Sequence, residues 1–243
     1  MRYIVKEFDK PLLIFSADMN SSNSNLQIEK IYEENDAFFP LNLTVSNGGL
    51  ESWLKHRVIP KNRAYVDALL SKTGLSANRP LGIIAVCKGL SLNDCYWVDS
   101  ADNESSFAKV NLYDNRFSTI LASIAFTGYG SSVRSSLFSS PEFSTNGMLP
   151  KCWRRINGKI YLYKGGTSGF SNTGFEPYSE LYAYQIAKAM EINAIRYTLT
   201  KDLKKSLCSK CELFTSKDYS YMPIGQLVRK GNMEAIREYY QTL

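Results

Sequence analysis

The chain has 243 residues, of which 44% are hydrophobic and 13% are aromatic, so it can bury the core of one large domain or two smaller ones. Its apolar runs are all shorter than the roughly 18 residues that a membrane span needs, and its first ten residues, MRYIVKEFDK, lack a signal-peptide core. Because its five cysteines are scattered, we expect a reduced, cytoplasmic protein with no disulfide framework and no membrane partner.

The positive net charge of +6 belongs to the second half of the chain. Residues 1–135 carry 14 basic and 14 acidic side chains, whereas residues 136–243 carry 15 basic and 9 acidic ones. A basic half suits an anionic ligand such as a nucleotide or a nucleic acid, although a solvated basic surface is the commoner meaning of such an excess.

The first 130 residues predict a mixed α/β subdomain, because short apolar runs alternate with segments of helical spacing. The Ser-, Gly- and Pro-rich stretch over residues 127–147 predicts a connection, and we place a domain boundary near residue 130. Strands are predicted over residues 11–19, 79–89, 95–100 and 108–115, and helices over residues 26–35, 50–54 and 65–70.

Residues 131–216 predict a small antiparallel sheet that carries one helix. The sequence LPKCWRRINGKIYLYK (149–164) is typical of a hairpin with an Asn-Gly turn at residues 157–158. A helix is predicted over residues 177–190, with Pro177 in its first turn. Two further strands are predicted over residues 194–200 and 206–216, and a closing helix over residues 233–243.

A lysine and a glutamate are predicted to face the interior together. On an extended strand Ile160, Leu162 and Lys164 share one side, and Glu180 lies on the apolar side of the following helix with Ala183, Tyr184, Ala187 and Met190. Each charge alone is costly to bury, whereas the pair satisfies both. Kinases hold a lysine against nucleotide phosphates in this way. The alternative is a surface lysine and a glutamate favoured by the helix dipole.

A polar turn lies between two predicted strands just before the lysine. Its residues Ser144, Thr145, Asn146 and Gly147 offer backbone amides and hydroxyls that could cap phosphates. The chain contains neither a Walker sequence nor a GxGxxG pattern, so an ordinary hairpin turn is the alternative.

The segments SPEFSTNGMLPKCW, KIYLYKGG, EPYSELYA and CELFT, in this order and spacing, resemble the amino-terminal lobe of HipA-like serine/threonine kinases. Upstream, WLKHRVIPKNRAYVDALLSKTGL and GLSLNDCYWV resemble the subdomain that precedes this lobe in one bacterial branch of the family. The resemblance implies a HipA-like N-terminal subdomain over residues 1–130 and a protein-kinase-like N-lobe, an antiparallel sheet with one packed helix, over residues 131–216.

The resemblance also implies roles for individual residues and for ligands. Lys164 matches the nucleotide-binding lysine and Glu180 matches its helix partner. The loop of residues 144–147 matches the phosphate-binding loop, which the family can phosphorylate on a serine or threonine, here Ser144 or Thr145. Segment 211–215, with Glu212 and Phe214, matches the hinge that meets adenine. The family phosphorylates protein substrates with ATP and Mg²⁺, often as the toxin of a toxin–antitoxin pair.

The chain departs from the family after the hinge. A kinase needs a later catalytic Asp, an Asn and a second, metal-binding Asp, but only 28 residues follow segment 211–215, and Asp218 lacks the expected neighbours. We therefore expect residues 217–243 to be a hinge extension and the start of a missing C-lobe, without catalytic residues or Mg²⁺ ligands. The chain would then be truncated, one part of a split kinase paired with a C-lobe chain or an antitoxin, or a remnant. A non-catalytic regulatory subunit or pseudokinase and a nucleic-acid-binding protein are the alternatives.

Two further patterns are interpreted as structural. Cys208 and Cys211 form a C-x-x-C pair, but a zinc site needs four ligands and the two sulfurs would face opposite sides of a strand, so core cysteines are expected. A basic cluster near Trp53 is interpreted as a solvated face or partner surface, with direct nucleic-acid contact less favoured; its members are Lys55, His56, Arg57, Lys61 and Arg63.

Overall fold

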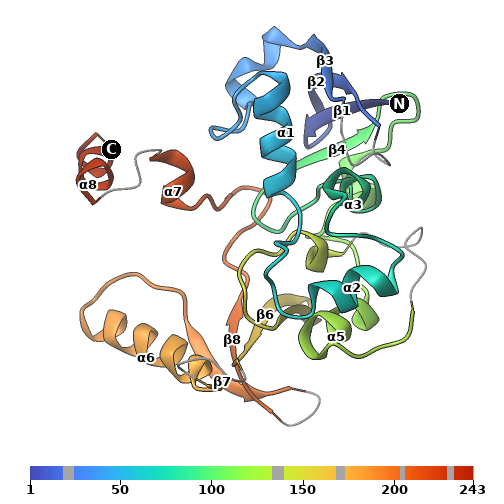
Figure 1. The fold of residues 1–243 in the computed structure, drawn as a ribbon. Helices are drawn as coiled ribbons and strands as arrows, with labels where there is room; N and C mark the ends of the chain where they lie inside the picture. The colour runs from blue at the N-terminus through green and yellow to red at the C-terminus, as the bar shows by residue number, and fades with distance from the viewer. Residues whose placement is uncertain (19–24, 133–139, 168–172, 203–205, 229–232, 243) are drawn as a thin grey trace.

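A computed structural model describes residues 1–18, 25–132, 140–167, 173–202, 206–228 and 233–242, and it contains two four-stranded antiparallel sheets together with several helices (Figure 1). The chain is therefore a mixed α+β protein, as the sequence predicts. Within these ranges, no helix has both the length and the apolar character that crossing a membrane requires.

The first sheet is built by the N-terminal residues and has the strand order β3-β2-β1-β4. Its strands are β1 (Arg2–Glu7), β2 (Lys10–Ser16), β3 (Gln27–Ile31) and β4 (Tyr96–Ser100). The strand predicted over residues 95–100 is confirmed, and the one predicted over residues 11–19 is confirmed as far as Ser16, with residue 19 outside the described residues. The helix predicted over residues 26–35 is wrong: β3 pairs with the edge of β2, and only then does the 3₁₀ helix η1 (Glu33–Phe38) begin.

Helices pack beside this sheet and continue toward the second one (Figure 1). They are α1 (Asn47–His56), α2 (Val66–Lys72), α3 (Pro80–Cys87), α4 (Phe107–Val110) and α5 (Thr119–Thr127). The hydroxyl of Ser46 fixes the start of α1 because it accepts the backbone N–H of Gly49 at 3.0 Å. The helices predicted over residues 50–54 and 65–70 are thus confirmed.

Two strands predicted in this region are wrong. Residues 79–89 form α3, in which Pro80 takes a first-turn position and Lys88 ends the helix in the left-handed conformation. Residues 108–115 form the end of α4 and a turn in which the Asn111 side chain accepts the backbone N–H of Asp114 at 2.8 Å. Short apolar runs fit a buried helix as well as a strand, so the local pattern does not decide between them.

The second sheet follows a short 3₁₀ helix, η3 (Pro141–Phe143), and has the strand order β5-β6-β8-β7. Its elements are β5 (Lys151–Ile156), β6 (Lys159–Gly165), α6 (Glu176–Ala189), β7 (Tyr197–Lys201) and β8 (Leu207–Glu212), followed by α7 (Ile224–Leu227) and α8 (Met233–Gln241). The predicted hairpin, the helix after Pro177 and both later strands are confirmed. Helix α6 lies along the sheet beside β7, whereas α8 lies apart from both sheets (Figure 1).

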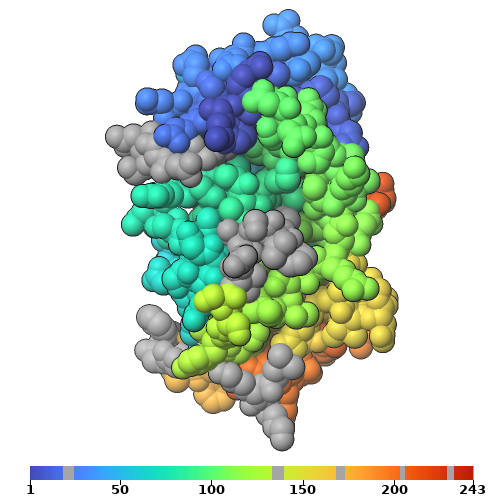
Figure 2. Space-filling view, turned by 90° about the vertical axis from the view of Figure 1, so that its right-hand side faces the viewer, coloured from blue at the N-terminus to red at the C-terminus, as the bar shows by residue number. Residues whose placement is uncertain are grey.

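The two halves share their hydrophobic cores across the predicted boundary at residue 130. Trp97 of β4 belongs to one cluster with Trp153 of β5. Phe126 of α5 packs with Cys152 and Tyr163 in another cluster. Seen from the side, the atoms of the first 130 residues run without a gap into those of the later strands (Figure 2). The N-terminal region is therefore structurally continuous with the second sheet.

Candidate functional site

Lys164 and Glu180 form the ion pair that the sequence predicts. The Lys164 Nζ lies 2.7 Å from the Glu180 Oε1, and the two side chains are 19% and 28% exposed. Lys164 also donates to the hydroxyl of Tyr197 on β7 at 2.6 Å. The lysine at the end of β6 is thus held between the helix and the outer strand, with its orientation fixed from two sides.

The helix behind this pair is less buried than predicted. Among the described residues of α6, Pro177 is the buried one, and Ala183 is exposed. Met190 follows the end of the helix and is 63% exposed, so its predicted place on the buried stripe with Glu180 is wrong. Helix α6 therefore turns only a narrow face toward the sheet.

The loop of residues 144–147 is well tied to the protein. Ser144 is buried, and its hydroxyl donates to the Pro141 carbonyl at 3.4 Å. The Thr145 hydroxyl donates to the same carbonyl at 2.5 Å and accepts the indole N–H of Trp153 at 2.8 Å. Gly147 has φ of +93°, a conformation that favours glycine. Phosphorylation of either hydroxyl would require these contacts to open.

Arg63, from the segment between α1 and α2, holds this loop from behind. Its guanidinium donates to the carbonyls of Glu142 and Thr145, both at 3.1 Å, and to that of Lys151 at 2.6 Å. The side chain is 3% exposed, and burial lowers the pKa of Arg63 to about 10. The loop and the first residue of β5 therefore depend on one buried cation from the N-terminal region.

Glu142 carries the carboxyl group whose charge acts on Arg63. It is fully buried, and it accepts hydrogen bonds from the Ser140 hydroxyl and from the backbone N–H of Trp153. Burial raises the pKa of Glu142, although these hydrogen bonds and Arg63 oppose that shift. The carboxyl thus fixes the start of β5 behind the loop.

Sequence reasoning did not find Lys151. It lies directly across the hairpin from Lys164, it is 7% exposed, and its Nζ donates to the Asn146 carbonyl at 2.8 Å. Burial lowers the pKa of Lys151 to about 8, with the charges of Arg63 and Lys164 adding to the shift. The signal was present: a two-residue turn at 157–158 fixes the register that pairs residue 151 with residue 164.

The 144–147 loop, Lys151 and Lys164 line a cavity of about 380 Å³ on the inner side of the second sheet. Apolar side chains, Leu162, Ile195 and Leu213, form part of its wall. Of the predicted site residues, the structure brings six to this cavity: Ser144, Thr145, Asn146, Gly147, Lys164 and Phe214. It therefore combines an apolar wall, a polar loop and two lysines.

The two other predicted residues lie differently. Glu180 supports the cavity through its bond to Lys164. Glu212 is about half exposed and pairs with Lys159 at 2.9 Å, so its side chain does not line the cavity. The hinge-like segment still reaches the site, because Thr215 donates its hydroxyl to the Leu92 carbonyl and anchors the chain beside Phe214.

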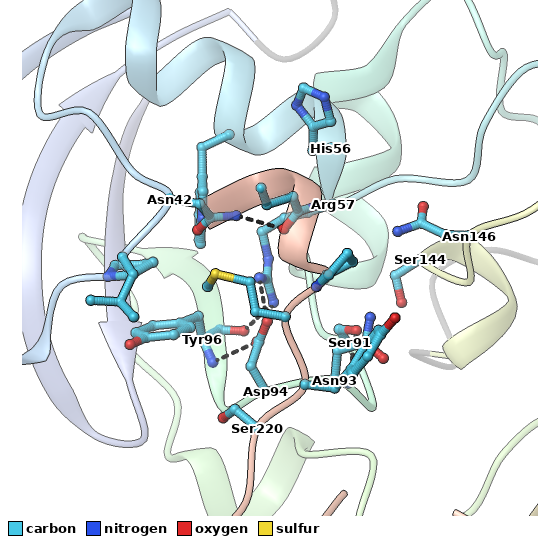
Figure 3. A pocket seen from close by; sticks show the side chains of 17 residues that line it. Asn42, His56, Arg57, Ser91, Asn93, Asp94, Tyr96, Ser144, Asn146 and Ser220 are labelled. Carbon is cyan, nitrogen blue, oxygen red and sulfur yellow. Dashed lines mark hydrogen bonds and ion pairs between the residues drawn. The ribbon is translucent and has the colours of Figure 1, made fainter. Parts of the chain in front are cut away.

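A second cavity, of about 270 Å³, adjoins the first one (Figure 3). The two cavities share lining residues, among them Ser144 and Asn146 of the 144–147 loop and Tyr221. Its base carries Arg57, which binds Asp94 through two hydrogen bonds of 2.7 and 2.9 Å (Figure 3). Arg57 also donates to two backbone carbonyls, so this ion pair has a structural role.

The predicted solvated basic face is therefore wrong for two of its members. Arg57 and Arg63 are buried, because each satisfies backbone carbonyls that would otherwise be unpaired. Lys55 fits the prediction and pairs with Glu51 at 2.8 Å, and His56 is exposed.

The predicted core cysteines are confirmed. Cys208 and Cys211 are both buried free thiols on β8. Across the described ranges, no group of three or more His, Cys, Asp or Glu side chains is placed to hold a metal ion. The described residues that line the cavity include no Asp or Glu and so offer no carboxylate for Mg²⁺, and we assign no step to that ion.

No protein-family model matches the chain, and no curated protein matches it either.

Proposed function

We propose that this chain is the ATP-binding portion of a HipA-like serine/threonine protein kinase, with residues 131–216 as a kinase-like N-lobe. The observation that carries the proposal is the ion pair of Lys164 and Glu180, 2.7 Å apart at a cavity lined by the 144–147 loop and segment 213–215. A strand lysine held by a helix glutamate is the arrangement with which kinases bind phosphates.

The lining of the cavity divides into two parts that match the two ends of a nucleotide. Leu162, Ile195 and Leu213 offer apolar surface for a base. Lys164 and the backbone of the 144–147 loop offer positive charge and N–H donors for phosphates. Among the described residues, the N–H groups of Asn146 and Gly147 have no hydrogen-bond acceptor, which leaves them available to an anion.

We assign binding to these residues but no phosphotransfer. Asp218 lies in an exposed turn, where its backbone N–H donates to the Ser216 hydroxyl at 3.0 Å. It has neither the position nor the neighbours of a catalytic base. Incubation of residues 1–243 with labelled ATP, Mg²⁺ and protein acceptors should therefore give only background transfer, and robust autophosphorylation would contradict the assignment.

Titration of a fluorescent ATP analogue into wild type and Lys164→Ala tests the binding site. Loss of a charge-assisted contact to phosphate should weaken binding by about tenfold to a hundredfold. Lys159→Ala is the matched control, because Lys159 lies on the same strand but pairs with Glu212 away from the cavity. Equal affinity of wild type and Lys164→Ala would count against the proposal.

A non-catalytic interaction subunit is the second candidate, and the outer face of α6 favours it. Tyr182, Ile186 and Met190 are each at least 60% exposed there, and Phe175 just before the helix is 65% exposed. Large apolar side chains gathered on one exposed face are typical of protein contacts. A C-lobe chain or an antitoxin is the proposed partner. Nucleotide binding without turnover, even when a C-lobe chain is supplied, would favour this candidate.

A nucleic-acid-binding protein would behave differently in the same measurements. Its affinity for nucleic acid would fall steeply with salt and would not depend on Lys164. The burial of Arg57 and Arg63 removes two cations from the surface that such binding would use.

A further inference from the structure

A second lysine faces the proposed phosphate region, and its position is fixed by the hairpin. Lys151 is the first residue of β5 and pairs in register with Lys164 of β6, so both side chains lie on the same side of the sheet. Both side chains line the same cavity of about 380 Å³. Two ammonium groups on directly opposed positions of neighbouring strands repel each other unless an anion lies near them.

The anions that the chain itself supplies do not balance these cations. Glu180 binds Lys164, and it is also the acidic group that raises the pKa of Lys151. The positive charges of Arg63 and Lys164 both lower the pKa of Lys151. Glu142 lies behind the loop and is committed to Ser140 and to the backbone of β5. The cavity side of the hairpin thus has an excess of positive charge.

Lys151 also has hydrogen-bonding capacity left over. An ammonium group has three N–H donors, and the described residues provide one acceptor for it, the Asn146 carbonyl at 2.8 Å. The Lys151 Nζ lies where a side chain at residue 147 would begin, because a Cβ on Gly147 would collide with it. The loop therefore holds Lys151 by a single hydrogen bond, and the absence of a side chain at residue 147 makes room for the ammonium.

We propose that Lys151 is a second phosphate-binding cation of this site, and that phosphate binding keeps it protonated. The inference rests on the proposed nucleotide site and adds a residue to it. With Lys164 bound to Glu180, Lys151 supplies the uncompensated positive charge for a second phosphate group of the ligand.

Protonation gives this role a measurable signature. The pKa of Lys151 is lowered to about 8 by burial and by Arg63 and Lys164, with Glu180 opposing the shift. Tyr197, which accepts from Lys164, is the remaining titratable neighbour on β7, and its pKa is raised by burial. A bound phosphate favours the ammonium form, so binding at pH 8.5 should take up roughly half a proton or more. Above pH 8 the affinity for ATP should fall, by about tenfold over the next one to two pH units.

Calorimetric titration of ATP and of AMP, in buffers of different ionisation enthalpy between pH 7 and pH 9.5, tests the proposal. Lys151→Gln should weaken ATP binding by about 10- to 100-fold and leave AMP binding nearly unchanged, because the second phosphate contact is lost. Lys151→Arg keeps a charge at every pH used, so the proton uptake and the alkaline loss of affinity should both disappear. Lys159→Gln is the matched control and should behave as wild type.

The outcomes separate this inference from the proposed function. If ATP binding depends on Lys164 but Lys151→Gln binds ATP as wild type does, or if Lys151→Arg keeps the proton uptake, the role of Lys151 is refuted while the nucleotide site stands. If wild type does not bind ATP at all, both proposals fail. If thermal unfolding shows that Lys151→Gln is not folded, the pH dependence of ATP binding and proton uptake, compared between wild type and Lys151→Arg, still tests the role of Lys151.

Discussion

Replacement of Arg63 by methionine should strongly destabilise the protein and release the 144–147 loop. The guanidinium makes three hydrogen bonds to backbone carbonyls at 3.1, 3.1 and 2.6 Å. Hydrogen bonds from a charged donor contribute about 1.5–3 kcal/mol each, so their loss costs on the order of 4–9 kcal/mol. The variant also avoids burying a charge, and the lowering of the Arg63 pKa from its ordinary value to about 10 sets that relief at about 3 kcal/mol. The expected net loss is about 1–6 kcal/mol.

Urea denaturation followed by tryptophan fluorescence measures the loss of stability, because Trp153 lies beside the loop with its indole bonded to Thr145. Amide hydrogen exchange of residues 142–148 should rise in Arg63→Met even under native conditions. Arg2→Met is the matched control: Arg2 pairs with Glu29 on the surface, and its loss should leave the midpoint nearly unchanged. The proposed role of Arg63 in holding the loop would be refuted if Arg63→Met were no less stable than Arg2→Met, or if amide hydrogen exchange of residues 142–148 did not change.

Three other predictions concern the same loop and hairpin. Gly147→Ala should lower the free energy of unfolding by about 1–3 kcal/mol and weaken ATP binding. Gly158→Ala is the control for backbone strain alone, because Gly158 has φ of +81° and open space around it. The free energy of unfolding of wild type, relative to that of Lys151→Met, should rise by up to about 3 kcal/mol between pH 8 and about pH 10.5. Over this range Lys151 keeps its proton in the unfolded chain and loses it in the folded one. If urea titrations gave the same difference in unfolding free energy at every pH, this prediction would be refuted. When a competent kinase is supplied, mass spectrometry should find phosphate on Ser144 or Thr145. Phosphorylation should be faster in Arg63→Met than in wild type, because the two hydroxyls must first leave their hydrogen bonds. Modification only at other residues would contradict this prediction.

Local signals predicted the second sheet well, and the reason is its hairpin. The Asn-Gly turn at residues 157–158 fixes both the strand ends and the register, so Lys164 could be placed on the inner face from the sequence. The same register also places Lys151 opposite Lys164, and this information was available but unused. The ion pair with Glu180 followed from two independent periodicities, that of a strand and that of a helix.

The N-terminal region was harder because its decisive contacts are not local. Residues 79–89 are nearly all apolar, so only Pro80 as a first-turn residue marks the helix. Within residues 26–35, Gln27–Ile31 form a strand because the edge of β2 is open to pairing, which local propensity does not register. Arg63 bonds backbone carbonyls 79 to 88 positions away, and no spacing rule connects an arginine to such partners.

The contacts of Arg63 explain why the N-terminal region and the second sheet form one unit. A loop that binds phosphates needs backbone N–H groups turned toward the ligand, and this leaves its carbonyls turned toward the protein interior. Those carbonyls must be satisfied there. Lys151 of the second sheet provides a donor for the Asn146 carbonyl. The segment between α1 and α2 provides the others, through one buried cation and through the N–H groups of Ile59 and Ala64, which bond the carbonyls of Phe143 and Met148. A ligand or partner that displaced residues 59–64 would therefore loosen the loop without touching the cavity. By the same coupling, occupation of the cavity by an anion should tighten the packing of the N-terminal region.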